Sequence, residues 1–226
     1  MKYIKYYLGF LAILSVSVFN GVLGQISHGG QPYSFTHQLQ TPNTVMPDAS
    51  ALTRLNFEEG KDCSGLEFAR FLPLNISLVS DEWQVNNLPN GDRIYQLSIK
   101  SKGALGLGVY FTNLFIPEGG ALFIYSLDHQ QYIGSFNHLN NKENQILATE
   151  FLYGDHVIIE YFEPQNKIGQ SHFTINEILH AYRGVRELDK DKGYGGSGDC
   201  EVNVNCPEGD GKKDQRDAVV RILIKK

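Results

Sequence analysis

Cysteine, methionine and tryptophan are scarce in this chain of 226 residues, which contains three, two and one of them. The cysteines show no Cys-x-x-Cys spacing, and the seven histidines show no His-x-x-x-His spacing. Zinc sites in proteins use such spacings, so the sequence predicts no metal site. No motif for an organic cofactor is present either, and we expect the chain to bind none.

An excess of basic residues is also lacking, since 20 Lys and Arg stand against 25 Asp and Glu, for a net charge of −5. No basic patch with interleaved aromatic residues occurs, so the sequence predicts no nucleic-acid partner.

The one long apolar stretch lies at the N-terminus. Lys2 and Lys5 precede the apolar run Leu8–Phe19, which falls short of the ~20 residues that a membrane-spanning helix needs. A positive start, a short apolar run and small or medium residues after it are typical of a signal peptide. We therefore expect residues 1–24 to be removed between Gly24 and Gln25, and the product to be secreted, extracellular or periplasmic. The alternative is a membrane anchor, but we expect no stable one.

Glycine is abundant, with 23 residues, and aromatic residues make up 12% of the chain. Many short apolar runs lie between turn signals such as Asn90-Gly91 and Pro117–Gly120. This pattern is typical of an all-β sandwich or barrel, and the moderate number of short strands favours an antiparallel β-sandwich over residues 51–184. Polar residues 25–50, with three prolines, predict an extended N-terminal arm. The predicted strands are Leu72–Leu78, Arg93–Lys100, Leu105–Phe111, Leu122–Tyr125, Tyr132–Phe136, Ile146–Phe151, Val157–Phe162 and Phe173–Tyr182.

Few side chains in this region suggest chemistry. Tyr110 lies on the polar face of its predicted strand and is a candidate for stacking on a sugar, although packing at a sheet edge is the simpler interpretation. His129 and His156 each follow an aspartate at a turn, and we expect both to be loop residues rather than ligands. Cys63 is interpreted as a small buried apolar residue.

The character of the chain changes after residue 184. Residues 185–198 are first charged and then rich in glycine, which predicts a solvated, flexible connector of the kind that proteases cut. Two cysteines then flank a short alternating run, and a turn of Pro-Glu-Gly-Asp-Gly follows at 207–211. Val219–Ile224 is β-branched and apolar and predicts a buried strand.

This C-terminal segment resembles the start of the mature domain in the lysyl endopeptidase family, which are secreted bacterial serine proteases of chymotrypsin-like fold. Residues 195–211 read Gly-Gly-Ser-Gly-Asp-Cys-Glu-Val-Asn-Val-Asn-Cys-Pro-Glu-Gly-Asp-Gly. Upstream, Phe173-Thr174-Ile175 and His180–Gly184 are similar to the end of the family's prosegment. The resemblance implies the front of a precursor, or zymogen: a signal peptide, a propeptide domain, and at 199–226 the truncated start of the protease β-barrel.

The resemblance also implies partners and processing. The downstream protease domain would be the partner of the prodomain, which would assist its folding and restrain it, and proteins would be the substrates of the full-length hydrolase. Self-cleavage after Lys192 would give a mature start at Gly193, with Lys190 as the second choice. An ordinary linker that is never cut is the alternative.

The pairing of the cysteines follows from the same implication. Cys200 and Cys206 would form disulfides with cysteines beyond this chain. A direct bridge between them is also possible, but five peptide steps of extended chain span about 16 Å, against a Cα–Cα limit of about 7 Å for a disulfide.

The catalytic machinery of such a protease is not in this sequence. A serine protease needs a histidine base, an orienting aspartate and a serine nucleophile. The family's Thr-Ala-x-His-Cys-like and Gly-x-Ser-Gly-Gly segments are both missing, and Ser197 lies in the connector before the first protease strand. We therefore predict no catalytic residue and no peptidase activity for this chain alone. Two other functions stay open: a secreted β-sandwich binding module for carbohydrate or a cell-surface protein, and a free protease inhibitor.

Overall fold

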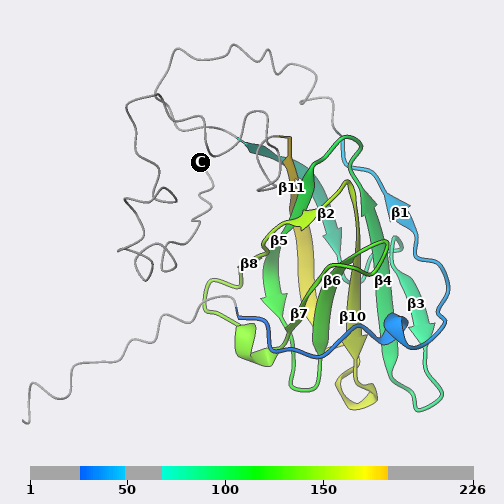
Figure 1. The fold of residues 1–226 in the computed structure, drawn as a ribbon. Coiled ribbons are helices and arrows are strands. Elements are labelled where there is room, and N and C mark those ends of the chain that lie inside the picture. Colours follow the sequence, from blue (N-terminus) through cyan, green and yellow to red (C-terminus); the bar gives the residue numbers. More distant parts are fainter. Residues whose placement is uncertain (1–25, 49–67, 183–226) are drawn as a thin grey trace, which may run out of the picture.

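The computed structural model describes residues 26–48 and 68–182, and this part of the chain folds into two β-sheets (Figure 1). The all-β prediction is confirmed. Sheet A contains β1 (Thr44–Val45), β3 (Gln84–Asn87), β4 (Arg93–Lys100), β6 (Ala121–Ser126), β7 (Tyr132–Phe136) and β10 (His156–Glu163). Sheet B contains β2 (Ala69–Ser77), β5 (Gly106–Phe115), β8 (Leu147–Ala148), β9 (Leu152–Tyr153) and β11 (His172–Ala181). In these described residues, three 3₁₀ turns accompany the strands: η1 (Tyr33–Phe35), η3 (His138–Asn140) and η4 (Gln165–Lys167).

Sheet A has the strand order β1-β4-β10-β6-β7, with β3 beside β1 on β4, and sheet B has the order β2-β11-β5-β8, with β9 also on β5. All pairs are antiparallel except one, because β1 runs parallel to β4 with Thr44 opposite Ser98. The parallel strand β1 belongs to the segment 25–50 that the sequence predicts to be an extended arm, and every described pair of strands within residues 68–182 is antiparallel. The N-terminal segment that carries β1 crosses the sheet first and so arrives beside β4 in the same direction.

The predicted strands agree closely with the observed ones in the middle of the chain. Arg93–Lys100 and Tyr132–Phe136 coincide with β4 and β7. The expectation that His156 is a loop residue is wrong, because β10 begins at this residue.

The predicted strand Ile146–Phe151 is divided in the structure. β8 ends at Ala148 and β9 begins at Leu152. At the break, the backbone N–H of Thr149 donates to the carbonyl of Val109 at 3.0 Å, while its hydroxyl accepts from the Val109 N–H at 2.9 Å. One side chain thus replaces a ladder hydrogen bond of β5, and the strand is interrupted there.

One hydrophobic core lies between the two sheets. Its centre is the ring of Phe173 on β11, which makes edge contacts with the rings of Phe111, Tyr161 and Trp83 at centroid distances of 5.6, 5.4 and 5.8 Å. Such edge-to-face aromatic pairs add to the free energy gained by burial. Within the two described ranges, no helix is long and apolar enough to span a bilayer.

Replacement of Phe173 by alanine should therefore lower the free energy of unfolding by about 3–5 kcal/mol, because it opens a cavity at the junction of the two sheets. Denaturant unfolding followed by tryptophan fluorescence measures the loss. Phe115→Ala is the matched control, since Phe115 is 38% exposed, and we expect a loss of about 1 kcal/mol or less. Equal losses in the two variants would contradict this description of the core.

Candidate functional site

The N-terminal segment 26–48, here named the arm, lies across the outer face of sheet A (Figure 1). At one edge it bonds to β7, where the N–H of His28 donates to Ser135 and the N–H of Ser135 donates to Gly29, both at 2.9 Å. At the other edge it forms β1 against β4. The arm therefore connects the two edges of the sheet and passes over its centre.

The centre of this crossing is the side chain of Glu160 on β10, which is 1% exposed. Its Oε1 accepts from the backbone N–H of Tyr33 at 2.5 Å and from that of Ser34 at 3.4 Å. These are N–H groups of the η1 turn, which have no partner within the turn itself. The buried glutamate and the arm thus satisfy each other's hydrogen-bonding groups.

Two further side chains of sheet A complete this polar network. Glu160 Oε2 accepts from the hydroxyl of Tyr125 at 3.2 Å and from Nε2 of Gln96 at 3.1 Å. The Tyr125 hydroxyl lies 2.9 Å from Oγ of Ser34 and accepts from Gln96 at 3.1 Å. Burial, followed by the negative charge of Glu160, raises the pKa of Tyr125 well above its ordinary value. The phenol therefore remains a proton donor to Glu160.

An aromatic cluster fixes the arm beside this network. The Phe35 ring makes edge contacts with Tyr125 at 5.1 Å and with Tyr132 at 5.6 Å, and stacks on His129 at 4.5 Å. With Phe123, Tyr125 and Ile158 it forms a second apolar cluster, on the outer side of sheet A. The outer face of the sheet is thus buried like the inner one, but by a single segment of chain.

The same network reaches β3 at the edge of the sheet. Asn86 Nδ2 donates to Oε1 of Gln96 at 3.4 Å, and Asn86 Oδ1 accepts from the N–H of Gln40 at 3.2 Å. Gln84 Nε2 donates to Oε1 of Gln40 at 2.6 Å. Side-chain amides therefore join the arm to β3, on the far side of the η1 turn.

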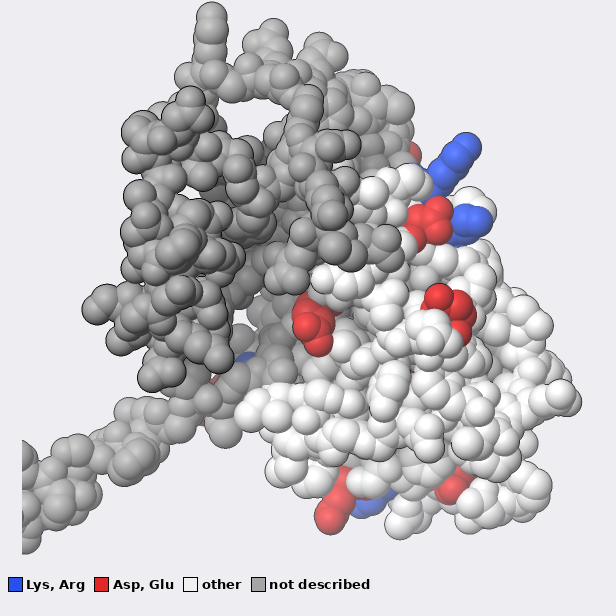
Figure 2. Space-filling view, viewed as in Figure 1, with Lys and Arg blue, Asp and Glu red and all other residues white. Residues whose placement is uncertain are grey.

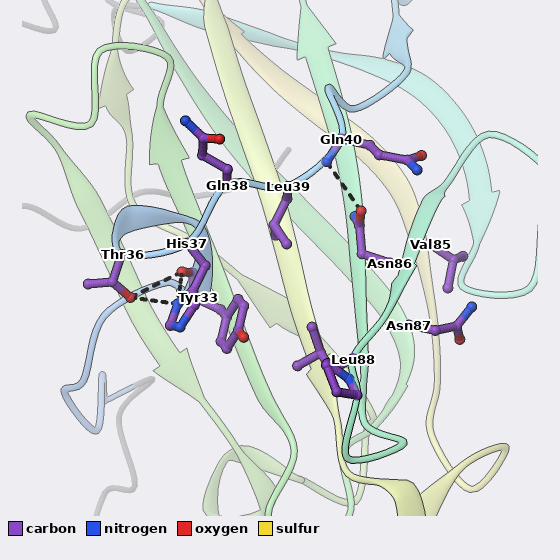
Figure 3. A pocket seen from close by; sticks show the side chains of 11 residues that line it. Tyr33, Thr36, His37, Gln38, Leu39, Gln40, Val85, Asn86, Asn87 and Leu88 are labelled. Atoms are coloured by element: carbon purple, nitrogen blue, oxygen red, sulfur yellow. Dashed lines mark hydrogen bonds between the residues drawn. The ribbon is translucent and has the colours of Figure 1, made fainter.

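Between η1 and β3 lies an open groove of about 930 Å³ (Figure 3). Tyr33 and residues 36–40 form one side, and residues 85–89 form the other. None of the residues that line it is Lys, Arg, Asp or Glu. Figure 2 shows the described surface on this side of the molecule largely without charged side chains. The groove is the candidate functional site, and it fits a neutral ligand.

The site residues predicted from sequence are not among those that line the groove. Gly24, Gln25, Lys190, Lys192 and Gly193 are all outside the described residues, as are Cys63, Cys200, Cys206 and Ser197. Tyr110 is described, and its half-buried ring packs against Phe71 at 6.1 Å.

Sequence reasoning did not single out Tyr33, Gln96, Tyr125 or Glu160. The sequence of β10 does indicate that something covers the outer face of this sheet. Val157–Phe162 is apolar at five of six positions and not merely at alternate ones. A strand of that composition is typical of a sheet that is covered on both faces.

Two serine–histidine pairs occur in the described residues. Ser101 Oγ lies 2.7 Å from Nδ1 of His180, and Ser98 Oγ lies 2.6 Å from Nε2 of His156. The first pair is buried, and the second is covered by Thr44 of the arm, whose hydroxyl donates to Ser98 at 3.1 Å. Neither hydroxyl faces open space, so both pairs fit a structural role.

A second buried glutamate, Glu163, holds the loop after β10. It accepts from the Tyr95 hydroxyl at 2.9 Å, the Gly169 N–H at 3.1 Å and the Ser171 hydroxyl at 3.2 Å. Tyr161 lies 2.5 Å from that serine. These contacts are internal to the fold and offer no space to a ligand. The described parts of the chain contain no group of three or more His, Cys, Asp or Glu placed to hold a metal ion.

Comparison with known proteins adds little. No protein-family model matches the chain. Among solved structures, it is similar to CsCBM6-3 from Clostridium stercorarium in complex with cellobiose, at 10% identity over 50% of this chain and 94% of that chain, with a TM-score of 0.23. A TM-score this low bears on neither the fold nor the function.

The Glu160 network makes a testable prediction about the arm. Glu160→Gln places an NH₂ group where two or more donors point, so at least one buried N–H or O–H loses its acceptor, at a cost of about 1–3 kcal/mol. Denaturant unfolding should detect this loss, and limited proteolysis should cut the arm faster. The exposed Glu118→Gln is the control. Unchanged stability and proteolysis in Glu160→Gln would contradict the anchoring role.

His180 makes a prediction about pH. Burial lowers the pKa of this histidine in the folded state, so below its ordinary pKa of about 6.5 the unfolded chain binds more protons at this position. The stability from His180 is present above that pH and is lost as the pH falls toward the lowered pKa. We expect the decrease in unfolding free energy between pH 7.5 and 5.5 to be smaller in His180→Gln than in the unaltered chain. An equal decrease in His180→Gln and in the unaltered chain would exclude this histidine as a source.

Proposed function

We propose that this chain is the N-terminal part of a secreted lysyl endopeptidase-like serine protease precursor, in which the two-sheet domain is a β-sandwich prodomain. The observation that carries the proposal is the motif at residues 195–211, with its two cysteines and the Pro-Glu-Gly-Asp-Gly turn. The prodomain would assist the folding of the protease and restrain it until cleavage.

The described domain supports this proposal through its contents. Its serine–histidine pairs are closed, its two buried glutamates are engaged in fixing the arm and a loop, and its open groove is neutral. Such a domain suits binding better than catalysis. A domain that binds the native protease and not its unfolded chain stabilises the native form by mass action, which is the physical basis of assisted folding.

The position of the last strand is consistent with the proposed order of parts. β11 pairs with both β2 and β5 and ends at Ala181. The last described backbone contact comes one residue later, where the Tyr182 N–H donates to the Phe68 carbonyl at 3.0 Å. In the sequence, the proposed processing linker at 185–198 begins three residues after Tyr182.

The test uses the precursor with its protease domain. We expect secretion to yield a mature protease beginning at Gly193, and N-terminal sequencing measures this. Lys192→Ala should move the start to Asp191, through cleavage after Lys190, and Lys190→Ala combined with Lys192→Ala should block maturation. Lys102→Ala, on the exposed surface of the described domain, is the control.

Two outcomes would overturn the proposal. One is a coding sequence beyond Lys226 without Thr-Ala-x-His-Cys and Gly-x-Ser-Gly-Gly segments in any frame. The other is hydrolysis of a lysyl ester by the purified 226-residue chain that is lost on heating.

A further inference from the structure

We propose that the groove between η1 and β3 binds a neutral oligosaccharide. The inference rests on the residues of this groove and does not depend on whether the chain belongs to a protease precursor. The surface offers three features that such a ligand needs: a flat ring held in place, side-chain amides without a partner, and a lining without Lys, Arg, Asp or Glu.

The flat ring is that of Tyr33. Its ring stacks on His37 with centroids 3.9 Å apart and an angle of 12° between the planes. His37 is itself held, because its Nδ1 lies 2.9 Å from the Thr36 hydroxyl and 3.2 Å from the Tyr33 carbonyl. Figure 3 shows the Tyr33 ring on one side of the groove, with Leu88 on the other. A fixed ring presents an apolar face to a sugar without losing much side-chain entropy on binding.

The amides come from both sides of the groove. Among the described residues, the side chains of Gln38 and Asn87 have no hydrogen-bond partner, and both are exposed. A side-chain amide both donates and accepts, so it can bond to two neighbouring hydroxyl groups of a sugar. A few such polar groups around an apolar surface are the usual composition of a small-ligand site.

The lack of charge selects the class of sugar. With no Lys or Arg in the lining, a uronic acid, sulfate or phosphate group would find no permanent cation, and it would lose part of its hydration on binding. A chain of neutral hexoses or pentoses has no charged group whose hydration would be lost on binding. The groove therefore favours neutral oligosaccharides over acidic ones.

A peptide is the competing ligand, and the arm disfavours it. An extended peptide would bind by adding to the free edge of β3. The arm crosses that edge, because the Gln40 N–H bonds to Asn86 at 3.2 Å and Asn43 Nδ2 bonds to the Glu82 carbonyl at 3.0 Å. The open part of the groove presents side chains rather than a strand edge.

The groove is also a built feature of the fold. Glu160 fixes the η1 side through the backbone N–H of Tyr33, and Gln96 fixes the β3 side through Asn86. Because Nε2 of Gln96 donates to Glu160 at 3.1 Å, one hydrogen-bonded network joins the two sides. Pre-organisation of this kind reduces the entropy lost when a ligand binds.

The test titrates the purified full chain with maltohexaose, cellohexaose, xylohexaose and mannohexaose, with hexagalacturonate as the acidic counterpart and an uncharged hexapeptide as the peptide probe. Isothermal calorimetry measures affinity, and NMR shifts of Tyr33 and His37 report the location. We expect at least one neutral hexasaccharide to bind with a Kd below 1 mM and the acidic one not to bind.

Variants separate the groove from other surfaces. Tyr33→Ala keeps the backbone N–H that anchors the arm and should weaken binding about tenfold or more, which corresponds to about 1.4 kcal/mol. Asn87→Ala lies away from the anchor and should weaken binding at least threefold even if Tyr33→Ala perturbs the arm. The matched control is Tyr153→Ala, at a partly exposed tyrosine of sheet B, which should bind as the unaltered chain does.

Three results would overturn the inference. They are failure of all four neutral hexasaccharides to bind at 1 mM, binding that neither groove variant weakens, and tighter binding of the hexapeptide than of any sugar at the same residues. None of these results bears on cleavage after Lys192, so failure of the sugar site and failure of the precursor proposal are distinguishable.

Discussion

The buried carboxyl group of Glu160 is the constraint on which the outer half of this fold depends. A glutamate that is 1% exposed is costly unless its oxygens are supplied with donors. Sheet A supplies two of them, from Tyr125 and Gln96, and the arm supplies two backbone N–H groups. All four donors are neutral, so hydrogen bonds rather than an ion pair stabilise the group. Arm and sheet are consequently coupled. Without the arm, the Glu160 carboxylate would lose two hydrogen-bond donors, and without Glu160, two backbone N–H groups of the arm would lose their acceptor.

That coupling explains how a segment with little regular structure keeps a defined path. The arm has only one short 3₁₀ turn and a two-residue strand, so its own backbone contributes little order. Its path is determined at three places: the edge of β7, the Glu160 network and the edge of β4. Phe35 adds apolar burial beside the central one. A groove bounded by such a segment can be as well fixed as one bounded by two strands.

The sequence predicts most of this fold, but it predicts the site poorly. The reason is that the site depends on contacts between residues that are far apart in the sequence. β4 follows from alternation, and β7 and β10 follow from short apolar runs between turn residues, all of which are local signals. The division between β8 and β9 depends on Thr149 bonding to Val109, forty residues away, and no local pattern reports it. The groove depends on contacts of still longer range, since Tyr33 and Glu160 are 127 residues apart. In the sequence, polar residues such as Gln96 and Asn86 cannot be distinguished from ordinary surface residues. Their role follows only from contacts with the arm and with Glu160.

The groove and the last described strand lie on different sheets. The groove is built on the outer face of sheet A, from the arm and β3. The C-terminal motif is connected to the other sheet, through β11, whose neighbours are β2 and β5. No residue that lines the groove belongs to sheet B. Substitutions in the groove therefore leave every side chain of sheet B unchanged, including those of β11, the strand that leads to the C-terminal motif in the chain. A binding defect caused by a groove variant can for this reason be assigned to the arm and β3, because the packing of sheet B is the same in the variant and in the unaltered chain.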